Sequence, residues 1–348
     1  MDTRSGAAEL LSHPEGALED LSKASGTTFP NLASARAHTP ERLATLRRDI
    51  GPLCESDRFS IVLFGSWARR ELTPHSDDDW AILVGGEASV NDSDVEAALA
   101  ATRDCLGQGA AKPGSQEIFG LAFRFDDLVT KIGLDDDTNT NLTRRMLLLL
   151  ESVPVSGQEV WEACRNEVLE RYLARGLKSH RPPRFLLNDL VRYWRTICVD
   201  FEGKHPLGGE GGDQKWVTRN AKLRTSRKML FAGGLIPVLM CHLREVSEMP
   251  EFLRAQLHAP PTDRLAAAFL AEGMVDEGAR TLAAYDKWVG LLQNELCRKE
   301  LLELTEATRE SSRLFQQITG LGRQLDRGLL ALLFDTQLGG ITRNFGIF

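Results

Sequence analysis

The stretch IVLFGSWARRELTPHSDDDWAILV, residues 61–84, decides the fold of this chain. The apolar, β-branched run from Phe59 to Phe64 predicts a buried strand. This strand ends at Gly65-Ser66, where the glycine lets the backbone turn sharply. Residues 80–84 (WAILV) predict a second buried strand, which follows the acidic triplet 77–79. The two strand ends therefore carry a glycine turn and a group of carboxylates.

These two strand ends hold the residue types that phosphate and metal chemistry uses. Backbone N–H groups in a turn after Gly65-Ser66 favour a phosphate. Side chains alternate along an extended segment, so we expect Asp77 and Asp79 to point the same way and Asp78 to point away. Two adjacent carboxylates repel each other unless a cation compensates, and their hard oxygens favour Mg²⁺ or Mn²⁺. The stretch thus predicts metal-assisted phosphoryl or nucleotidyl transfer.

A family resemblance rests on the same residues. Gly65-Ser66, ten intervening residues, Asp77-x-Asp79 and the apolar run after it resemble the core motif of the DNA polymerase β-type nucleotidyltransferase superfamily. The fuller string GSWARRELTPHSDDDWAIL is most similar to bacterial branches, namely the PII uridylyltransferase-like group and the minimal and antibiotic nucleotidyltransferases, with relatives fused to helical domains. Arg69, Glu71 and Ser76 also fall where that pattern places them.

The resemblance implies a fold, a reaction and site residues. The fold is α+β: a polymerase β-like domain, built as a small mixed sheet with flanking helices, precedes an all-helical domain. The reaction moves an NMP from an NTP, with ATP expected, to a hydroxyl of a protein, a tRNA or a small molecule and releases pyrophosphate. Asp77 and Asp79 would hold Mg²⁺ or Mn²⁺, and Gly65 and Ser66 would cradle phosphates. Arg69 would stabilise developing charge.

The superfamily usually adds a third metal-binding acid on a neighbouring strand. The alternating pattern from Glu117 to Phe125 predicts that strand. Glu117 opens it and is our candidate for the third catalytic carboxylate and metal ligand. Asp126, at its other end, is the alternative, although an acid at this position also suits the start of a helix.

The second half of the chain adds basic candidates. From Asn141 onward we find only helical periodicity, interrupted by prolines such as Pro154. In the helix predicted for residues 183–201, Asn188, Arg192 and Arg195 share a face that would bind the nucleotide or simply meet solvent. The segment 215–228 has six basic residues and no acid.

This basic segment has three open interpretations. Lys215, Arg219 and Lys222 share one helical face, which would contact the triphosphate or an anionic acceptor. Alternatively the face binds RNA, or it is a solvated surface with extended basic side chains. We expect Trp216 to belong to the core.

Domain boundaries follow from composition and helix signals. We expect a helical extension at 1–36, the nucleotidyltransferase domain at 37–155 and an all-helical substrate or partner domain at 156–348. Thr39-Pro40-Glu41 predicts a helix start, because it combines a capping hydroxyl, a proline and an acid.

Composition limits the alternatives. The 348 residues carry a net charge of −7, which argues against coating nucleic acid through bulk electrostatics. The sequence shows neither a signal peptide nor an apolar run long enough for a membrane, so we expect a cytoplasmic protein. Six scattered cysteines suggest reduced, buried side chains. A catalytically inactive NTP sensor, an RNA- or partner-binding module and a homo-oligomer remain open.

Overall fold

The structure, a computed structural model, describes residues 10–51, 54, 56–107, 110, 118–204 and 216–346. It is α+β and divides into two compact units. The sheet unit comprises residues 34–176, and the helical unit comprises the described residues of 1–33 and 177–348. Helix α3 (Pro30–Ile50) begins in the helical unit and continues into the sheet unit. We expected domain boundaries at 36/37 and 155/156, whereas the two units divide at 33/34 and 176/177.

A mixed four-stranded sheet organises the sheet unit, in the order β3-β2-β1-β4. Its two central strands have the bounds expected from the sequence, which confirms both predictions. They pair antiparallel, with Leu63 opposite Trp80, whereas β3 runs parallel to β2. The strands are β1 (Phe59–Phe64), β2 (Trp80–Val84), β3 (Ala122–Arg124) and β4 (Ser152–Ser156).

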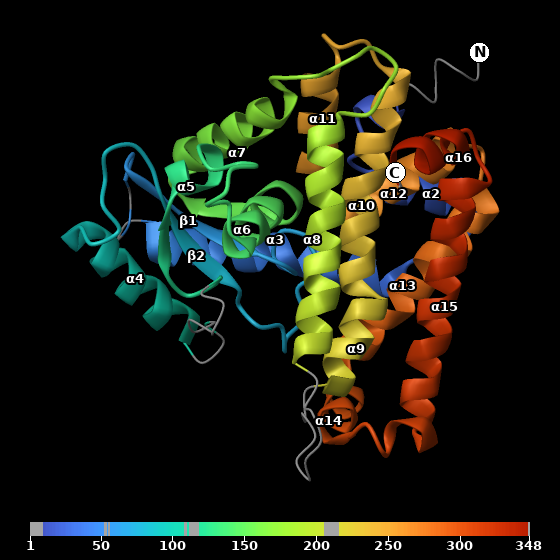
Figure 1. The fold of residues 1–348 in the computed structure, drawn as a ribbon. Coiled ribbons are helices and arrows are strands. Elements are labelled where there is room, and N and C mark those ends of the chain that lie inside the picture. Colours follow the sequence, from blue (N-terminus) through green and yellow to red (C-terminus); the bar gives the residue numbers. More distant parts are fainter. Residues whose placement is uncertain are drawn as a thin grey trace. The chain divides into compact units, whose positions relative to one another are not determined.

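Both faces of the sheet are covered, which explains why β1 and β2 are buried throughout and, except for Ser60, apolar instead of alternating. On one face, side chains of both strands join a core with Leu46 and Ile50 of α3 and with Val95 of α4 (Ser93–Leu106). Helix α7 (Gln158–Leu173) packs on the sheet as well, and Figure 1 shows it on the side opposite α4. The remaining helices of this unit are α5 (Phe125–Val129) and α6 (Asn139–Leu150).

Strand β4 contradicts the prediction of helices alone after Asn141. It pairs antiparallel with β1, and Val62 lies opposite Pro154 at a break in the register. Proline has no N–H to donate to the hydrogen-bond ladder of a sheet, so within sheets it is confined to edge strands and irregular positions. The proline in this segment therefore concealed the strand in the sequence. The third strand is shorter than expected, because the regular pairing covers Ala122–Arg124 only.

Helix α3 contradicts the predicted helix start at Thr39. The helix runs from Pro30 through Pro40 to Ile50 without interruption. The hydroxyl of Thr39 donates to the carbonyl of Ala35 at 2.7 Å inside the helix instead of capping its first turn. The same oxygen accepts a hydrogen bond from the backbone N–H of Leu72 at 3.2 Å. Thr39-Pro40 therefore lies inside a continuous helix, and Thr39 contacts the 65–72 segment from there.

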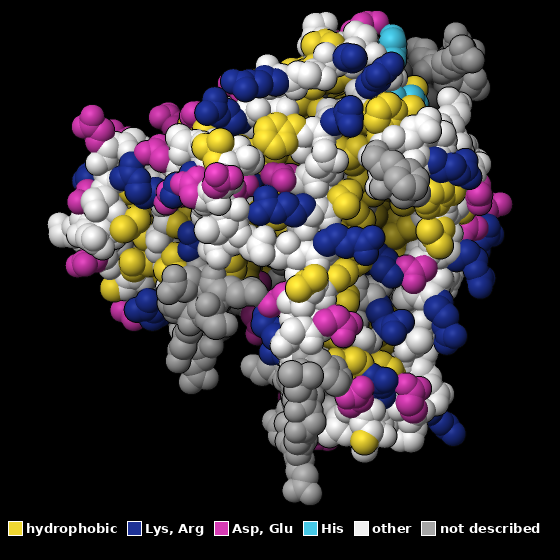
Figure 2. Space-filling view, in the orientation of Figure 1, with side chains coloured by type: hydrophobic (Ala, Val, Ile, Leu, Met, Phe, Trp, Pro, Cys, Tyr) yellow, Lys and Arg dark blue, Asp and Glu magenta, His cyan; other side chains and the backbone are white. Residues whose placement is uncertain are grey.

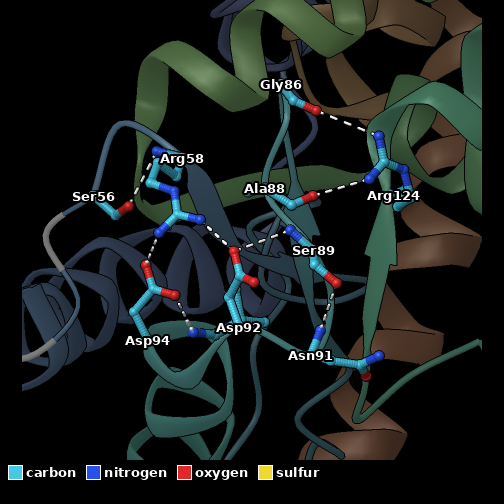
Figure 3. Close-up of polar contacts among 10 residues, drawn as sticks. Ser56, Arg58, Gly86, Ala88, Ser89, Asn91, Asp92, Asp94 and Arg124 are labelled. Carbon is cyan, nitrogen blue, oxygen red and sulfur yellow. Dashed lines mark hydrogen bonds and ion pairs between the residues drawn. The ribbon is translucent and has the colours of Figure 1, made fainter.

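Two arginines fix the end of the sheet at which β2 finishes (Figure 3). Arg58 precedes β1 and forms ion pairs with Asp92 and Asp94 around the start of α4. Arg124 donates to the backbone carbonyls of Gly86 and Ala88 in the loop between β2 and α4. Both arginines are well exposed to solvent, so these pairs orient the loop more than they stabilise the unit.

A fully buried ion pair joins α6 to the loop that precedes it, and a hydrogen bond connects it to α7. Arg145 donates two hydrogen bonds, each 2.8 Å long, to the carboxylate of Asp137 and a third of 2.9 Å to the hydroxyl of Tyr172. Burial alone would lower the pKa of Arg145, but the hydrogen bonds to Asp137 and the charge there raise it. Arg145 thus stays charged in a site where both partners are almost inaccessible to solvent.

The helical unit packs around two buried helices, α10 (Ser226–Met240) and α12 (Pro261–Ala271). These two contact each other closely, and Gly233 of α10 leaves no room for a Cβ against Pro261. The other helices are α2 (Ala17–Ser25), α8 (Arg184–Gly203), α9 (Trp216–Arg224), α11 (Met249–His258), α13 (Val275–Gln293), α14 (Glu295–Glu303), α15 (Arg313–Phe334) and α16 (Leu338–Ile341), with short turns at Cys241–Leu243, Arg309–Ser311 and Thr342–Gly346.

Two buried aspartates hold the starts of two helices within this unit. Asp263 accepts a hydrogen bond of 3.0 Å from the backbone N–H of Leu18 at the start of α2. Asp286 accepts one of 2.8 Å from the N–H of Leu32 at the start of α3. A carboxylate at the positive end of a helix is favourable, and burial strengthens this effect. None of the described helices is long and apolar enough to span a membrane.

We predict that Arg145→Met lowers the free energy of unfolding of the sheet unit by about 3–5 kcal/mol, because it leaves the Asp137 carboxylate buried without its countercharge. Urea denaturation followed by circular dichroism measures this change. The double substitution Arg145→Met/Asp137→Leu should cost less than Arg145→Met alone. Additive effects of the two substitutions would contradict the coupling of the pair.

Candidate functional site

The glycine turn and the acidic triplet meet at the end of the β1–β2 pair. Leu63 and Trp80 are partners in the ladder, and the N–H of Phe64 donates to the carbonyl of Asp79 at 2.8 Å. Gly65 follows with φ +66°, a left-handed conformation that favours glycine. The chain therefore turns away from the sheet next to the point where the acidic segment enters it.

Gly65, Asp79 and Arg69 lie together at this turn. A Cβ atom placed on Gly65 would lie 3.3 Å from Oδ2 of Asp79 and 3.8 Å from Nη1 of Arg69. The missing side chain therefore makes space for the carboxylate and the guanidinium. Asp79 is half-buried, whereas Asp77 is exposed to solvent. The structure thus brings together three of the expected site residues, and Ser66 is next to them in the chain.

Asp78 also contacts the turn after Gly65, through a hydrogen bond from Trp67. Its Oδ1 accepts a hydrogen bond of 2.8 Å from the indole N–H of the buried Trp67. Burial raises the pKa of Asp78, the hydrogen bond from Trp67 and the charge of Arg42 oppose this rise, and Asp77 adds to it. Asp78 therefore ties the acidic segment to the turn after Gly65.

The segment between the turn and the acids is held by local hydrogen bonds. The N–H of Arg69 donates to the carbonyl of Gly65 at 3.0 Å, and that of Glu71 donates to Ser66 at 2.8 Å. A second turn is closed by Ser76, whose hydroxyl accepts from the N–H of Thr73 at 3.0 Å. The helical turn expected after Gly65-Ser66 is thus present as successive turns.

Arg69 lies between two buried carboxylates. Its Nε donates to Glu71 at 2.8 Å, and its Nη1 forms a close ion pair with Glu151. Glu71 belongs to the quoted motif, but Glu151 lies 80 residues further along, at the junction of α6 and β4. Sequence analysis missed Glu151 because the strand that positions it was not predicted. An acid directly after the apolar run 146–150 was the available signal.

The two candidates for a third carboxylate differ in position. Glu117 lies outside the described residues, which resume at Ile118. Asp126 follows β3, whose last residue, Arg124, is opposite Val84 at the far end of β2 from Asp79. It pairs with Arg124 at 2.6 Å and is exposed. Asp126 therefore does not join Asp77 and Asp79.

The donor set fits a magnesium-type ion on chemical grounds. Mg²⁺ in phosphoryl-transfer sites is commonly bound by one or two carboxylates together with substrate phosphates and water. Asp77 and Asp79 supply that number, and the cradle at Gly65 keeps one of them in place. Among the described residues, no group of three or more His, Cys, Asp or Glu side chains is arranged to hold a metal.

The described basic candidates of the second half belong to the helical unit. Arg192 lies on α8 with Asp189 at 3.8 Å, and Arg219 and Lys222 lie on α9, while Lys215 is outside the described residues. The expected basic helix is interrupted at Thr225, between α9 and α10. Arg219 and Lys222 therefore lie three residues apart on α9, whereas Arg227 and Lys228 belong to α10.

Two basic side chains of this segment have acidic or amide partners. Lys228 of α10 forms an ion pair with Asp326, and Arg224 donates to the side chain of Asn220. On the face shown in Figure 2, Lys and Arg side chains are interspersed with Asp and Glu over this area. Trp216 is buried, with its ring 5.5 Å from that of Phe201, so the prediction that it belongs to the core is confirmed.

The sequence matches no protein-family model, and a search of curated proteins found no match either.

We predict that Gly65→Ala weakens Mn²⁺ binding, because its Cβ would displace the Asp79 carboxylate. Gly86→Ala is the matched control: Gly86 also has a positive φ, +57°, but nothing lies within 4 Å of its Cβ position. Both substitutions should lower the free energy of unfolding by about 1–2 kcal/mol through the left-handed backbone. Electron paramagnetic resonance of Mn²⁺ measures the binding. Equal Mn²⁺ affinity in the two variants would contradict the assignment of Asp79 as a metal ligand.

Proposed function

We propose that the protein is a metal-dependent nucleotidyltransferase with a polymerase β-like domain in its sheet unit. The observation that carries the proposal is the position of Asp79, whose carboxylate lies against the Gly65 turn at the end of two paired strands. A glycine turn next to metal-binding carboxylates is the combination that nucleotidyl transfer requires. The motif and its spacing support the same conclusion.

The roles of the residues follow from their positions. Asp77 and Asp79 would hold a divalent cation, and the turn that begins at Gly65-Ser66 would direct backbone N–H groups to the triphosphate. When bound, the cation supplies Lewis-acid stabilisation of the phosphate charge. Trp67 and Asp78 keep the two segments in fixed positions through their hydrogen bond.

The proposed reaction is an in-line displacement at the α-phosphorus of an NTP. The acceptor hydroxyl oxygen forms a bond to phosphorus, the bond to the leaving pyrophosphate breaks, and the hydroxyl proton passes to solvent or a nearby base. The acceptor would be a protein, an RNA or a small molecule. We assign Arg192, Arg219 and Lys222 to nucleotide or acceptor binding as part of this proposal.

We predict that Asp79→Asn lowers metal-dependent pyrophosphate release by roughly 100-fold or more, because several kcal/mol of charge stabilisation depend on the cation that it holds. Asp78→Asn is the matched control, since its amide oxygen can still accept from Trp67. A coupled pyrophosphate assay with each NTP, with and without cell lysate, measures the rates. If Asp79→Asn releases pyrophosphate as fast as the unmodified protein, the enzyme proposal fails.

The acceptor requires a separate measurement. Incubation with each α-³²P-labelled NTP and lysate, followed by protease or ribonuclease treatment, distinguishes label in protein, RNA and small molecules. We predict that the label is lost in Asp77→Ala/Asp79→Ala and is reduced in Arg219→Ala/Lys222→Ala. NTP binding without label transfer or pyrophosphate release would instead favour a nucleotide sensor.

A further inference from the structure

Three buried charged side chains lie beside the Gly65 turn. Arg69 is bound on two sides, by Glu71 at Nε and by Glu151 at Nη1. The side chains of the two glutamates are only 4% and 8% exposed, and that of Arg69 is 14% exposed. Arg69 thus joins two acidic side chains, one within the motif and one far from it in sequence.

The three residues come from separate parts of the sheet unit. Arg69 and Glu71 lie in the turns between β1 and β2, whereas Glu151 ends α6 and precedes β4. Pairing of β4 with β1, in which Ser152 lies opposite Phe64, places Glu151 next to the end of β1. The ion pair between Arg69 and Glu151 therefore links the turn that starts at Gly65 to the residue before β4, in addition to the pairing of β1 with β4.

The ion pair also bears on Asp79. Nη1 of Arg69, the atom that pairs with Glu151, lies 3.8 Å from the Cβ position of Gly65, and Oδ2 of Asp79 lies 3.3 Å from the same position. A guanidinium this close attracts the Asp79 carboxylate and opposes the binding of a cation there. Glu151 offsets that charge and fixes the guanidinium by a charge-assisted hydrogen bond.

We propose that Glu151 is a positioning residue of the candidate site, which acts through Arg69 to hold the Gly65 turn and to keep Asp79 available to a divalent cation. This inference rests on the proposed function, because it assigns Asp79 to the metal. It adds a residue outside the motif and explains why Arg69 has two acidic partners. Outer residues that orient metal ligands commonly change metal affinity when they are substituted.

The test is Mn²⁺ binding to the full-length protein, measured by electron paramagnetic resonance. Glu151→Gln keeps the size of the side chain and removes its charge, so we expect Mn²⁺ affinity to fall about 10–100-fold. The Mg²⁺ concentration for half-maximal pyrophosphate release should rise in parallel, while the rate at saturating Mg²⁺ falls much less. Glu159→Gln, on the exposed start of α7, is the control for loss of one negative charge and should bind as the unmodified protein does.

A double variant separates the electrostatic role from a structural one. Arg69→Gln/Glu151→Gln removes both charges and keeps a hydrogen-bonding pair, so we expect it to recover Mn²⁺ affinity relative to Glu151→Gln. A residue that served only folding would not give this recovery. Urea denaturation of each variant identifies any loss of folded protein, and the double variant still tests the idea if Glu151→Gln is unstable.

The outcomes distinguish this inference from the proposed function. If Asp79→Asn loses Mn²⁺ but Glu151→Gln retains it, Glu151 has no positioning role and the proposed function stands. The inference is also overturned if the double variant binds Mn²⁺ as weakly as Glu151→Gln. If Asp79→Asn itself binds Mn²⁺ normally, both the inference and the assignment of the metal to this site fail.

Discussion

The antiparallel pairing of β1 and β2 is the constraint on which the candidate site depends, because it sets the end of one strand against the start of the other. The hydrogen bond from Phe64 to the carbonyl of Asp79 is the last contact of that ladder. One residue further along, Gly65 leaves the sheet with a positive φ and makes room for the Asp79 carboxylate. A shift of one residue would turn Asp79 to the other face of the sheet. The apolar residues of both strands, buried on both faces, hold the register.

Much of this arrangement is predictable from the sequence, because local signals and packing agree there. The bounds of β1 and β2 match the apolar runs, because every residue of both strands is buried and only Ser60 is polar. The glycine turn and the acidic segment contact each other through Asp78 and Asp79. Helix α8 likewise follows its predicted range, residues 183–201, closely.

The missed features share a physical cause, which is that tertiary contacts overrode a local signal. Pro154 suggested a break between helices, but a proline is tolerated where the β1–β4 register shifts. Thr39-Pro40 suggested a helix start, but Thr39 bonds to the carbonyl of Ala35 and to the N–H of Leu72 instead. Glu151 could not be assigned to the site because its position depends on β4. Each error concerned a residue whose partner is distant in sequence.

The register of β3 restricts where a third carboxylate can come from. Because β3 is parallel to β2, its early residues lie beside the start of β2: the N–H of Gly120 donates to the carbonyl of Trp80 at 2.7 Å. From there the strand runs away from Asp79, at about 3.3 Å per residue. An acid on this strand that shares a cation with Asp79 must therefore precede Gly120, which excludes Asp126. The direction of this strand thus argues against Asp126, whereas Glu117 lies outside the described residues.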